Sequence, residues 1–367
     1  MTRLTPLAGS LPATVPFTGP EALERASGIP FAARLGANES GFGPSPRAVE
    51  AMRAAAQDAW MYGDPECFDL RQAIAARHGT TADHVAAGEG IDGLLGTLVR
   101  LTAGPGDTVV TSAGAYPTFA FHVAGFGARL VRVPYRGDHE DPQALLDAAR
   151  EADARLVYLA NPDNPMGSHH PGAVVEAMVD GLPGGTLLVL DEAYVDLAPP
   201  GTAPRIDPAD PRVIRLRTFS KAHGLAGLRV GYALGAPALI GAFDRVRNHF
   251  GLGRVAQAGA LAALGDADWP AAVRRAVEAA RAGVARIARA NGLEPLPSAT
   301  NFTAIDCGRD GAFARRVLAG LTAEGVFVRM PGVAPLDRCI RVTLAPDDAL
   351  AAFADALPRA LASARAA

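Results

Sequence analysis

The sequence predicts an α/β fold with a mainly parallel, seven-stranded sheet between helices, joined to a smaller α+β domain. Three observations lead to this prediction. Between residues 80 and 232, short β-branched runs alternate with glycine-bearing turns and helix-like stretches, the pattern of βαβ units. Polar residues suited to chemistry stand where these runs end, and in such sheets ligands gather beyond the carboxyl ends of the strands. Residues 260–367 instead combine two alanine- and arginine-rich helical stretches with three separate strand-like runs.

The elements follow in order along the chain. The strands expected in the large sheet are 84–87, 108–111, 128–133, 155–160, 186–190, 213–216 and 229–234, with a helix over 91–101. The later part predicts helices over 270–291 and 347–364 and strands over 301–307, 325–329 and 339–343. We therefore expect a large domain over 46–260. Residues 1–45 and 261–367 would form an N-terminal arm and a smaller α+β domain, and the proline-rich start of the arm suggests an extended segment.

Composition excludes several classes of protein. Hydrophobic residues make up 49% of the 367 residues, but they occur in short runs, so no membrane span is expected. The N-terminus lacks the continuous apolar stretch of a signal peptide. A net charge of −3 without basic clusters argues against nucleic-acid or anionic-membrane partners. Three widely separated cysteines and scattered histidines indicate neither disulfides nor a metal site, and we expect a cytoplasmic protein.

The segment 213–232, VIRLRTFSKAHGLAGLRVGY, places Lys221 between two strand-like runs. Burying an ammonium is costly unless the group is paired or neutral, and a neutral lysine amine can condense with a carbonyl. Thr218, Ser220 and Arg229 add two hydroxyl donors and a fixed cation, a set that suits a phosphate. The alternative is a surface lysine in a glycine-rich turn.

Further candidates stand at other strand ends. Asp191 ends the buried run LLVLD, where an ionised carboxylate needs a cationic partner unless it caps the next turn. Asn164, in NPDNPMG, is fixed by flanking prolines and Gly167, although an Asx-turn without a ligand would look the same. The turn formed by Gly88, Glu89 and Gly90 opens a helix, whose free N–H groups can bind a phosphate. A plain tight turn is the alternative.

Two further residues could contact a ligand. Tyr116 follows a strand and precedes a proline, so its ring could stack on a planar group or simply pack in a turn. Arg341 lies inside the strand-like run CIRVT, where an arginine usually pairs with a carboxylate or phosphate. A surface arginine on an edge strand is the alternative.

The motif SKAHGLAGLR resembles the lysine segment of the pyridoxal-phosphate aminotransferases of fold type I, class I/II, and is most similar to the histidinol-phosphate aminotransferase group. The resemblance extends from about Leu35 to about Leu344. It implies a fold type I transferase in which Lys221 carries pyridoxal 5′-phosphate and Ser220 and Arg229 hold the cofactor's phosphate. In the D-E-A-Y motif it assigns Asp191 to the pyridine nitrogen and Tyr194 to the ring hydroxyl.

The resemblance assigns the remaining candidates as well. Asn164 would form a hydrogen bond with the oxygen on the cofactor ring, although Met166 replaces the threonine of the family's N-P-T-G motif. Gly88, Glu89 and Gly90 would offer backbone amides to the phosphate, with the Glu89 carboxylate pointing away, and Tyr116 would stack on the ring. Tyr62 would reach the phosphate in the partner subunit of a homodimer. Substrate would be held by Arg341 at its α-carboxylate, by Arg329 at its distal group, and near the mouth by Asn38 and its neighbour Glu39.

The implied reaction moves an amino group between an L-amino acid or amino-alcohol phosphate and a 2-oxo acid such as 2-oxoglutarate, with Lys221 as general base and acid. A decarboxylase of the same fold, of the threonine-phosphate type, would share these residues. A non-catalytic pyridoxal-phosphate sensor is a further alternative, but it would need a nucleic-acid-binding segment for which length and charge leave no room.

The N-terminal arm departs from the family. It reads Val15-Pro16-Phe17, whereas histidinol-phosphate aminotransferases commonly carry a Pro-Tyr pair whose hydroxyl helps hold the substrate phosphate. Losing a donor weakens the recognition that depends on it. We therefore expect an aromatic or other apolar amino acid to be used at least as well as histidinol phosphate. The alternative is that Phe17 is a neutral variant.

Overall fold

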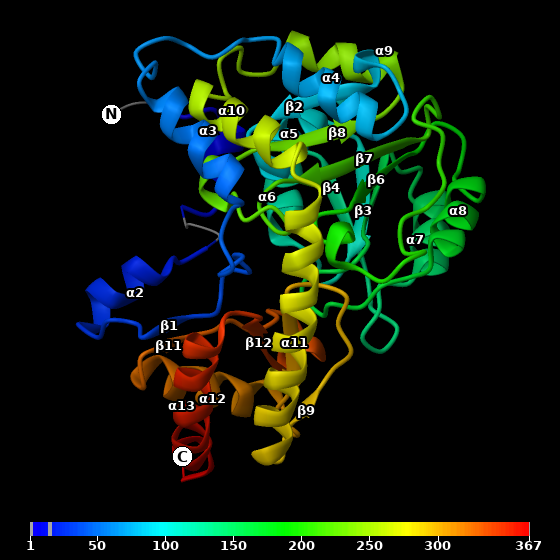
Figure 1. The fold of residues 1–367 in the computed structure, drawn as a ribbon. Helices are drawn as coiled ribbons and strands as arrows, with labels where there is room; N and C mark the ends of the chain where they lie inside the picture. Colours follow the sequence, from blue (N-terminus) through cyan, green and yellow to red (C-terminus); the bar gives the residue numbers. More distant parts are fainter. Residues whose placement is uncertain (1–2, 14–16, 367) are drawn as a thin grey trace.

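The computed structural model describes residues 3–13 and 17–366, and a seven-stranded sheet forms its centre (Figure 1). The strand order is β2-β8-β7-β6-β5-β3-β4. The strands are β2 (Val85–Gly88), β3 (Thr108–Ser112), β4 (Arg129–Val133), β5 (Leu156–Ala160), β6 (Leu187–Asp191), β7 (Val213–Thr218) and β8 (Gly231–Leu234). Strand β8 runs antiparallel to both of its neighbours, β2 and β7, and the other neighbouring pairs are parallel. The predicted mainly parallel sheet is confirmed, and each of its strands overlaps a predicted run.

Helices cover both faces of the sheet, which explains why its strands are apolar along their whole length. In β5, Leu156 and Tyr158 pack toward α5 (Gly90–Thr102) and α6 (Pro117–Gly125). The alternating residues Val157 and Leu159 pack toward α7 (Pro142–Glu151) and α8 (Gly172–Asp180). A third cluster joins β2 and β8 to α3 (Pro46–Ala56), α4 (Phe68–Arg77) and α10 (Arg254–Leu264). Helix α9 (Pro237–Ala242) follows β8.

The C-terminal part forms a second unit, which hangs below the sheet in Figure 1. The long helix α11 (Asp268–Ala290) leads from the sheet into this unit (Figure 1). Its antiparallel sheet has the order β12-β10-β9, from Cys339–Thr343, Phe302–Asp306 and Glu294–Pro295. Helices α12 (Gly311–Ala323) and α13 (Asp347–Ala366) pack beside α11 around one apolar core. The helices and strands predicted for this region are confirmed within a few residues. Short 3₁₀ helices occur at Ala82–His84, Val195–Leu197, Ala226–Leu228, Phe243–Arg245 and Leu336–Arg338.

The N-terminal arm joins the second unit through a strand pair. Strand β1 (Ala33–Arg34) runs parallel to β11 (Val326–Phe327). The arm is not simply extended, which corrects the sequence-based expectation: it contains α1 (Pro6–Ser10) and α2 (Pro20–Ser27). In each the proline occupies the start of the helix, where its missing N–H costs nothing. Val15 and Pro16 lie outside the described residues.

The division into two domains remains a prediction, and the connection between the units refines where we place it. The expected boundary at residue 260 falls inside α10, which packs against α3 and α4 of the large unit. We therefore propose that the boundary follows α10, before α11 begins. Within the described residues, no helix combines the length and apolar character needed to cross a membrane.

Candidate active site

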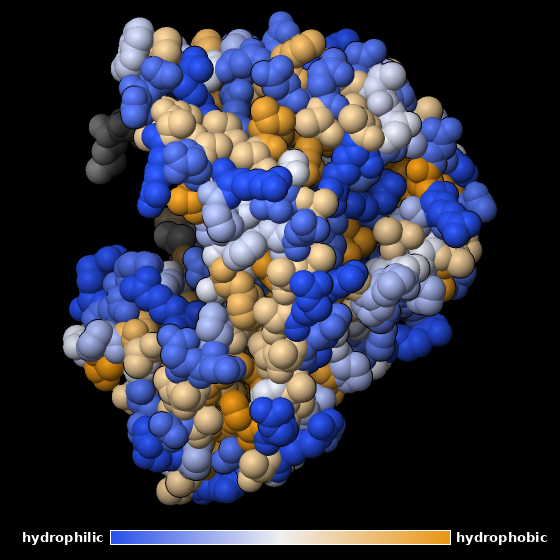
Figure 2. All heavy atoms as spheres, viewed as in Figure 1, coloured by the Kyte–Doolittle hydropathy of each residue, from blue (hydrophilic) through white to orange (hydrophobic). Residues whose placement is uncertain are grey.

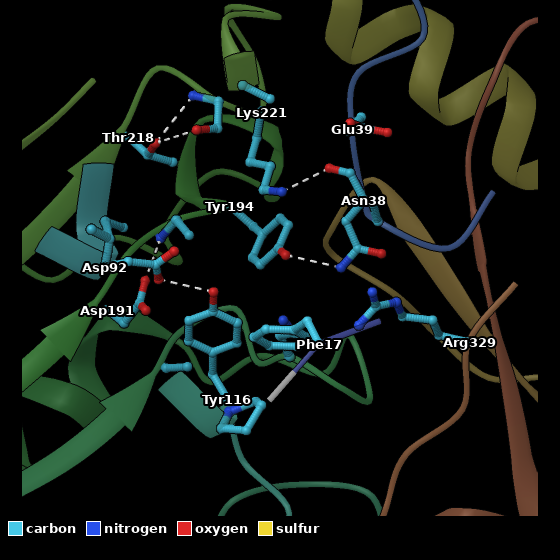
Figure 3. A pocket seen from close by; sticks show the side chains of 18 of the residues that line it. Phe17, Asn38, Glu39, Asp92, Tyr116, Asp191, Tyr194, Thr218, Lys221 and Arg329 are labelled. Atoms are coloured by element: carbon cyan, nitrogen blue, oxygen red, sulfur yellow. Dashed lines mark hydrogen bonds between the residues drawn. The ribbon is translucent and has the colours of Figure 1, made fainter. Parts of the chain in front are cut away.

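A cavity of about 390 Å³ opens at the carboxyl ends of β5, β6 and β7, within the size range of small-molecule sites (Figure 3). Residues from the arm, the large sheet and the C-terminal unit line it together. Of the residues singled out from the sequence, it brings together Phe17, Asn38, Glu39, Tyr116, Asn164, Asp191, Tyr194, Thr218, Ser220, Lys221, Arg229, Arg329 and Arg341.

The amine of Lys221 lies inside this cavity, just after β7. Its Nζ donates a hydrogen bond of 2.8 Å to the backbone oxygen of Asn38 and lies 5.5 Å from the centre of the Tyr194 ring (Figure 3). Burial lowers the pKa of Lys221 to about 8, and the charges of Arg341 and Arg229 act in the same direction. The amine is therefore largely neutral in mildly alkaline solution, the form that attacks a carbonyl.

Lys221 is also the only lysine in the whole sequence, in which every other basic side chain apart from the histidines is an arginine. An arginine serves as well as a lysine for solubility and ion pairing, but it cannot provide a neutral amine. The single lysine therefore marks a position where an amine is required. This signal was present in the sequence and was not used in predicting the site.

A group of donors stands beside the lysine. The Thr218 hydroxyl donates to Ser220 Oγ at 2.9 Å, and Arg229 Nη1 lies 3.4 Å from the same oxygen. Arg229 Nη2 also pairs with Asp92 at 3.3 Å. At the start of α5, a Cβ added to Gly90 would lie 2.5 Å from Arg229 Nη2, so only a glycine allows this close approach. The helix start, two hydroxyls and a guanidinium thus form a cradle that fits a phosphate.

Asp191 lies at the end of β6 and is nearly fully buried. Its Oδ2 accepts a hydrogen bond of 2.7 Å from the Tyr158 hydroxyl, and its Oδ1 accepts one of 2.9 Å from the Ala193 amide. Burial raises the pKa of Asp191 to about 6, while the bonds from Tyr158 and Ala193 lower it. The carboxylate can therefore stay ionised near neutral pH, facing a cavity large enough for a cationic ring.

Arg341 and Asn164 also line the cavity and contact each other. Arg341 Nη1 donates to Asn164 Oδ1, and its Nη2 donates to the backbone oxygen of Gly36 at 3.1 Å. Arg341 Nε is buried without a partner among the described residues, so the guanidinium retains capacity for an anion. Burial lowers the pKa of Arg341 to about 10, which still leaves it charged at neutral pH. The surface-arginine alternative does not describe this environment.

Asn38 connects the arm to the lysine and to Tyr194. Its Nδ2 donates to the Tyr194 hydroxyl at 3.1 Å, and its backbone oxygen accepts from both Lys221 and Asn301 Nδ2. Asn38 has a φ of 55°, a left-handed conformation that asparagine tolerates better than most residues. Burial raises the pKa of Tyr194 to about 12, so its hydroxyl stays protonated.

Phe17 and Tyr116 form the aromatic wall of the cavity. Their rings stack with centres 6.1 Å apart, and the Tyr116 hydroxyl donates to Asp92 at 2.9 Å (Figure 3). The Arg329 guanidinium lies 5.0 Å from the centre of the Phe17 ring and donates to the Thr18 backbone oxygen at 2.9 Å. The arm therefore brings an aromatic face and a cation to the mouth of the site.

Some predicted residues do not line the cavity. Gly88, Glu89 and Gly90 are absent from the cavity lining, although Gly90 lies close to Arg229, and the Glu89 carboxylate accepts from Asn248 Nδ2 at 2.9 Å. Tyr62 lies elsewhere on the surface, beside Phe250, and its side chain is absent from the cavity of its own chain.

Two lining residues with ionisable side chains, Asp92 and Tyr158, were missed. Asp92 resembles an ordinary acidic residue in the first turn of a helix, and only the fold shows its bonds to Arg229 and Tyr116. Tyr158 stands inside an apolar strand, where a core role is the natural interpretation. Its position two residues before the end of β5, on the same face of the sheet as Asp191, is the signal that could have identified it.

Comparison with known proteins identifies the family. The model of the family "Aminotransferase class I and II" matches residues 33–357. A histidinol-phosphate aminotransferase of Rhodospirillum centenum is 37% identical over 93% of this chain and 94% of its own length, and one of Anaeromyxobacter is 38% identical over 94% and 95%. The crystal structure of histidinol-phosphate aminotransferase from Sinorhizobium meliloti in complex with pyridoxal-5′-phosphate covers 99% of this chain and 98% of its own, with 54% identity and a TM-score of 0.95.

These matches and the lysine-centred cavity define an enzyme of the transaminase class. Within that class, the chain belongs to the aminotransferase class I and II family. An aspartate aminotransferase of Thermus thermophilus, at 23% identity and a TM-score of 0.80, shares the fold.

Proposed function

We propose that this aminotransferase uses pyridoxal 5′-phosphate to move an amino group between histidinol phosphate and 2-oxoglutarate. The observation that carries the proposal is the site of Lys221, an amine of lowered pKa that shares one cavity with Asp191 and the Ser220–Arg229 cradle. The names of the similar proteins support the substrate. When bound, pyridoxal phosphate supplies a carbonyl carbon and a ring that accepts electrons from the reacting carbon.

The residues present fit this cofactor. Ser220, Thr218, Arg229 and the amides of the turn 88–90 would hold its phosphate, with the closeness of Gly90 to Arg229 as the supporting geometry. Asp191 would face the ring nitrogen. Tyr116 would stack on the ring, while Tyr194 and Asn164 would form hydrogen bonds with the ring's hydroxyl oxygen. All three residues line the same cavity.

The protein's own side chains would perform the proton transfers. The Lys221 amine, neutral above about pH 8, would act as general base and accept the proton from the carbon that bears the amino group. It would then act as general acid and donate this proton back. The arginines Arg341 and Arg329 would bind the anionic groups of the two substrates, a carboxylate or a phosphate in turn. Asn38, which contacts both Lys221 and Tyr194, would hold the amine ready.

We further propose that the enzyme is a homodimer with shared active sites. Tyr62 is 76% exposed and Trp60 81% exposed, together with Phe68, Phe250 and Leu261. Figure 2 shows apolar residues gathered over α3 and α10, the helices beside this region. Such an exposed apolar surface is typical of an interface. The three cysteines are buried free thiols, which agrees with the cytoplasmic location we propose.

The deciding experiment mixes purified protein with histidinol phosphate and measures glutamate formation with and without 2-oxoglutarate. Glutamate should form when the 2-oxo acid is present. Because histidinol phosphate has no carboxyl group to lose, a second assay supplies threonine phosphate without a 2-oxo acid and measures carbon dioxide, whose release would favour the decarboxylase alternative. Borohydride should fix the cofactor on Lys221. The variants Lys221→Ala and Lys221→Arg should both be inactive, because arginine keeps the charge but cannot supply a neutral amine. An active Lys221→Arg enzyme would contradict the proposal.

A further inference from the structure

The hydroxyl of Tyr158 donates a hydrogen bond to the carboxylate of Asp191, which would face the ring of the proposed cofactor. Tyr158 lies in the middle of β5, and Asp191 ends the neighbouring parallel strand β6. In the register of the two strands, Asp191 stands opposite Ala160. Because Ala160 is small, the longer Tyr158 side chain, two residues earlier on the same face, can reach diagonally to Asp191 Oδ2 at 2.7 Å.

Packing fixes the tyrosine in this position. Tyr158 is fully buried, and its ring stacks on Phe119 of α6 with centres 4.5 Å apart and planes 18° from parallel. Burial raises the pKa of Tyr158 well above its usual value, so the hydroxyl keeps its proton and acts as a donor. The side chain also lines the cavity, which places this hydrogen bond at the wall of the site.

The other charges near Asp191 are already compensated. The titratable groups that face it are Tyr158, Asp92 from α5, Glu192, Tyr194 and Glu140. The Glu140 carboxyl accepts hydrogen bonds from the Ser112 hydroxyl at 2.6 Å and the Ala160 amide at 2.9 Å. Asp92 pairs with Arg229, and Glu192 lies between Arg215 and Arg217 at 2.8 and 2.9 Å. Tyr158 in turn faces Asp191, Glu140 and Tyr116. Among the side chains that the structure describes, Tyr158 is thus the donor that acts directly on the Asp191 carboxylate.

From this geometry we infer that Tyr158 is a positioning residue that keeps Asp191 ionised and aimed at the cofactor's ring nitrogen, so that the proton between the two stays on nitrogen. This inference rests on the proposed function. A carboxylate that accepts two hydrogen bonds is a weaker base than one that accepts a single bond. Without the Tyr158 hydroxyl, Asp191 becomes the stronger base and takes the shared proton, and the neutral ring withdraws fewer electrons from the substrate.

The test compares Tyr158→Phe with a matched control, Tyr232→Phe. Tyr232 is a buried tyrosine of the same sheet, on β8. Its hydroxyl forms a hydrogen bond of 3.0 Å with His78 Nε2 and none with Asp191. Both variants lose one hydroxyl. Holoenzyme is prepared with pyridoxal phosphate labelled with nitrogen-15 in the ring, and the ring resonance is recorded together with kcat and KM.

In Tyr158→Phe the nitrogen resonance should move toward that of unprotonated pyridine. Its kcat should fall roughly 10- to 100-fold, the effect expected from losing a hydrogen bond to a charged group, while KM for the amino donor changes little. Tyr232→Phe should keep the wild-type resonance. In the Asp191→Asn background, adding Tyr158→Phe should have no further effect on kcat, because the two residues act through one contact.

Several outcomes would overturn the inference. One is a wild-type resonance and kcat in Tyr158→Phe. Another is failure of Tyr158→Phe to fold while Tyr232→Phe folds, which would assign the hydroxyl to stability alone. Additive losses in the double variant would also contradict it. If the wild-type protein neither binds pyridoxal phosphate nor transaminates, the proposed function itself fails, and this result is distinct from the others.

Discussion

At the scale of single residues, the site depends on groups whose ionisation is changed by burial. In the cofactor-free protein, Lys221 should react with fluorodinitrobenzene, to which an amine adds only in its neutral form, with a midpoint near pH 8. Because Lys221 is the only lysine, mass spectrometry of its peptide gives the titration without interference. The same peptide in the unfolded chain should titrate near the ordinary lysine value of 10.5. Equal midpoints in the two states would show that the folded site does not lower the pKa.

The same shift predicts how stability depends on pH. Since the folded pKa lies below the unfolded one, the unfolded chain binds more protons between about pH 8 and 10.5. The stability of the cofactor-free protein should therefore gain a contribution from Lys221 as the pH rises through this window. In Lys221→Met that contribution disappears, so the difference in melting temperature between the variant and the wild type should be largest below pH 8 and shrink above it. A difference that does not vary with pH would contradict this assignment.

A second prediction concerns the charge of Asp191. Asp191→Asn preserves the shape but removes the charge that would face the ring nitrogen, and kcat should fall roughly 10²-fold, as for other electrostatic deletions in active sites. Asp196→Asn is the matched control, because Asp196 follows in the next 3₁₀ turn, lies 3.6 Å from Arg217 and does not line the cavity. Wild-type kcat in Asp191→Asn would assign this carboxylate to capping the turn through Ala193.

A third prediction concerns substrate choice at Phe17. The ring of Phe17 carries no hydroxyl and stands between Tyr116 and Arg329, so an apolar or aromatic side chain can pack there. We expect phenylalanine to rival histidinol phosphate in kcat/KM, and Phe17→Tyr to shift the preference toward the phosphate substrate. Phe31→Tyr, in the same arm but packed on Phe327, is the control. If wild-type enzyme prefers histidinol phosphate by roughly a hundredfold, about 2.7 kcal/mol, Phe17 is a neutral variant.

At the scale of elements, the start of α5 tests the phosphate cradle. Gly90 has a φ of +71°, and a Cβ there would meet Arg229 Nη2 at 2.5 Å. Gly90→Ala should therefore displace the guanidinium and raise the dissociation constant of pyridoxal phosphate at least roughly tenfold, the loss of about one charge-assisted hydrogen bond. Gly79→Ala is the control, with a φ of +63° and open space around it. If the two variants bind the cofactor with equal affinity, the close approach of Gly90 to Arg229 has no effect of its own on binding, and only the backbone conformation at the glycine matters.

The same scale shows what sequence could predict. The strands were predictable because a parallel sheet covered on both sides needs apolar residues throughout, as in Leu187–Asp191. Lys221, Asp191 and Asn164 were predictable because Asp191 ends such a strand and the other two follow one. Tyr158 and Asp92 were not, because their roles depend on the register of β5 against β6 and on the approach of α5 to Arg229. The two helices of the arm were missed because its prolines suggested extension, whereas Pro6 and Pro20 begin helices.

At the scale of the whole molecule, Tyr62 suggests that one chain does not complete its own site. Its ring stacks on Phe250 at 4.6 Å, Arg254 donates to its backbone oxygen at 3.0 Å, and its hydroxyl has no role in the cavity of its own chain. If Tyr62 serves the partner's cavity, Tyr62→Phe should weaken cofactor binding although the residue lies on the surface. Such an effect requires a dimer, which sedimentation or light scattering would detect.

Mixing two impaired variants tests the shared site directly. In a heterodimer of Tyr62→Phe and Lys221→Ala, one site carries both changes and the other carries neither. With free exchange of equal amounts, half of the dimers are mixed and each has one intact site, so roughly a quarter of the wild-type activity should return. Asp191→Asn mixed with Lys221→Ala is the control: both residues line the cavity of their own chain, so every site in that heterodimer keeps one change and no activity should return. Recovery in the control alone, or in neither mixture once exchange is verified, would mean that each chain builds its active site without Tyr62 of its partner.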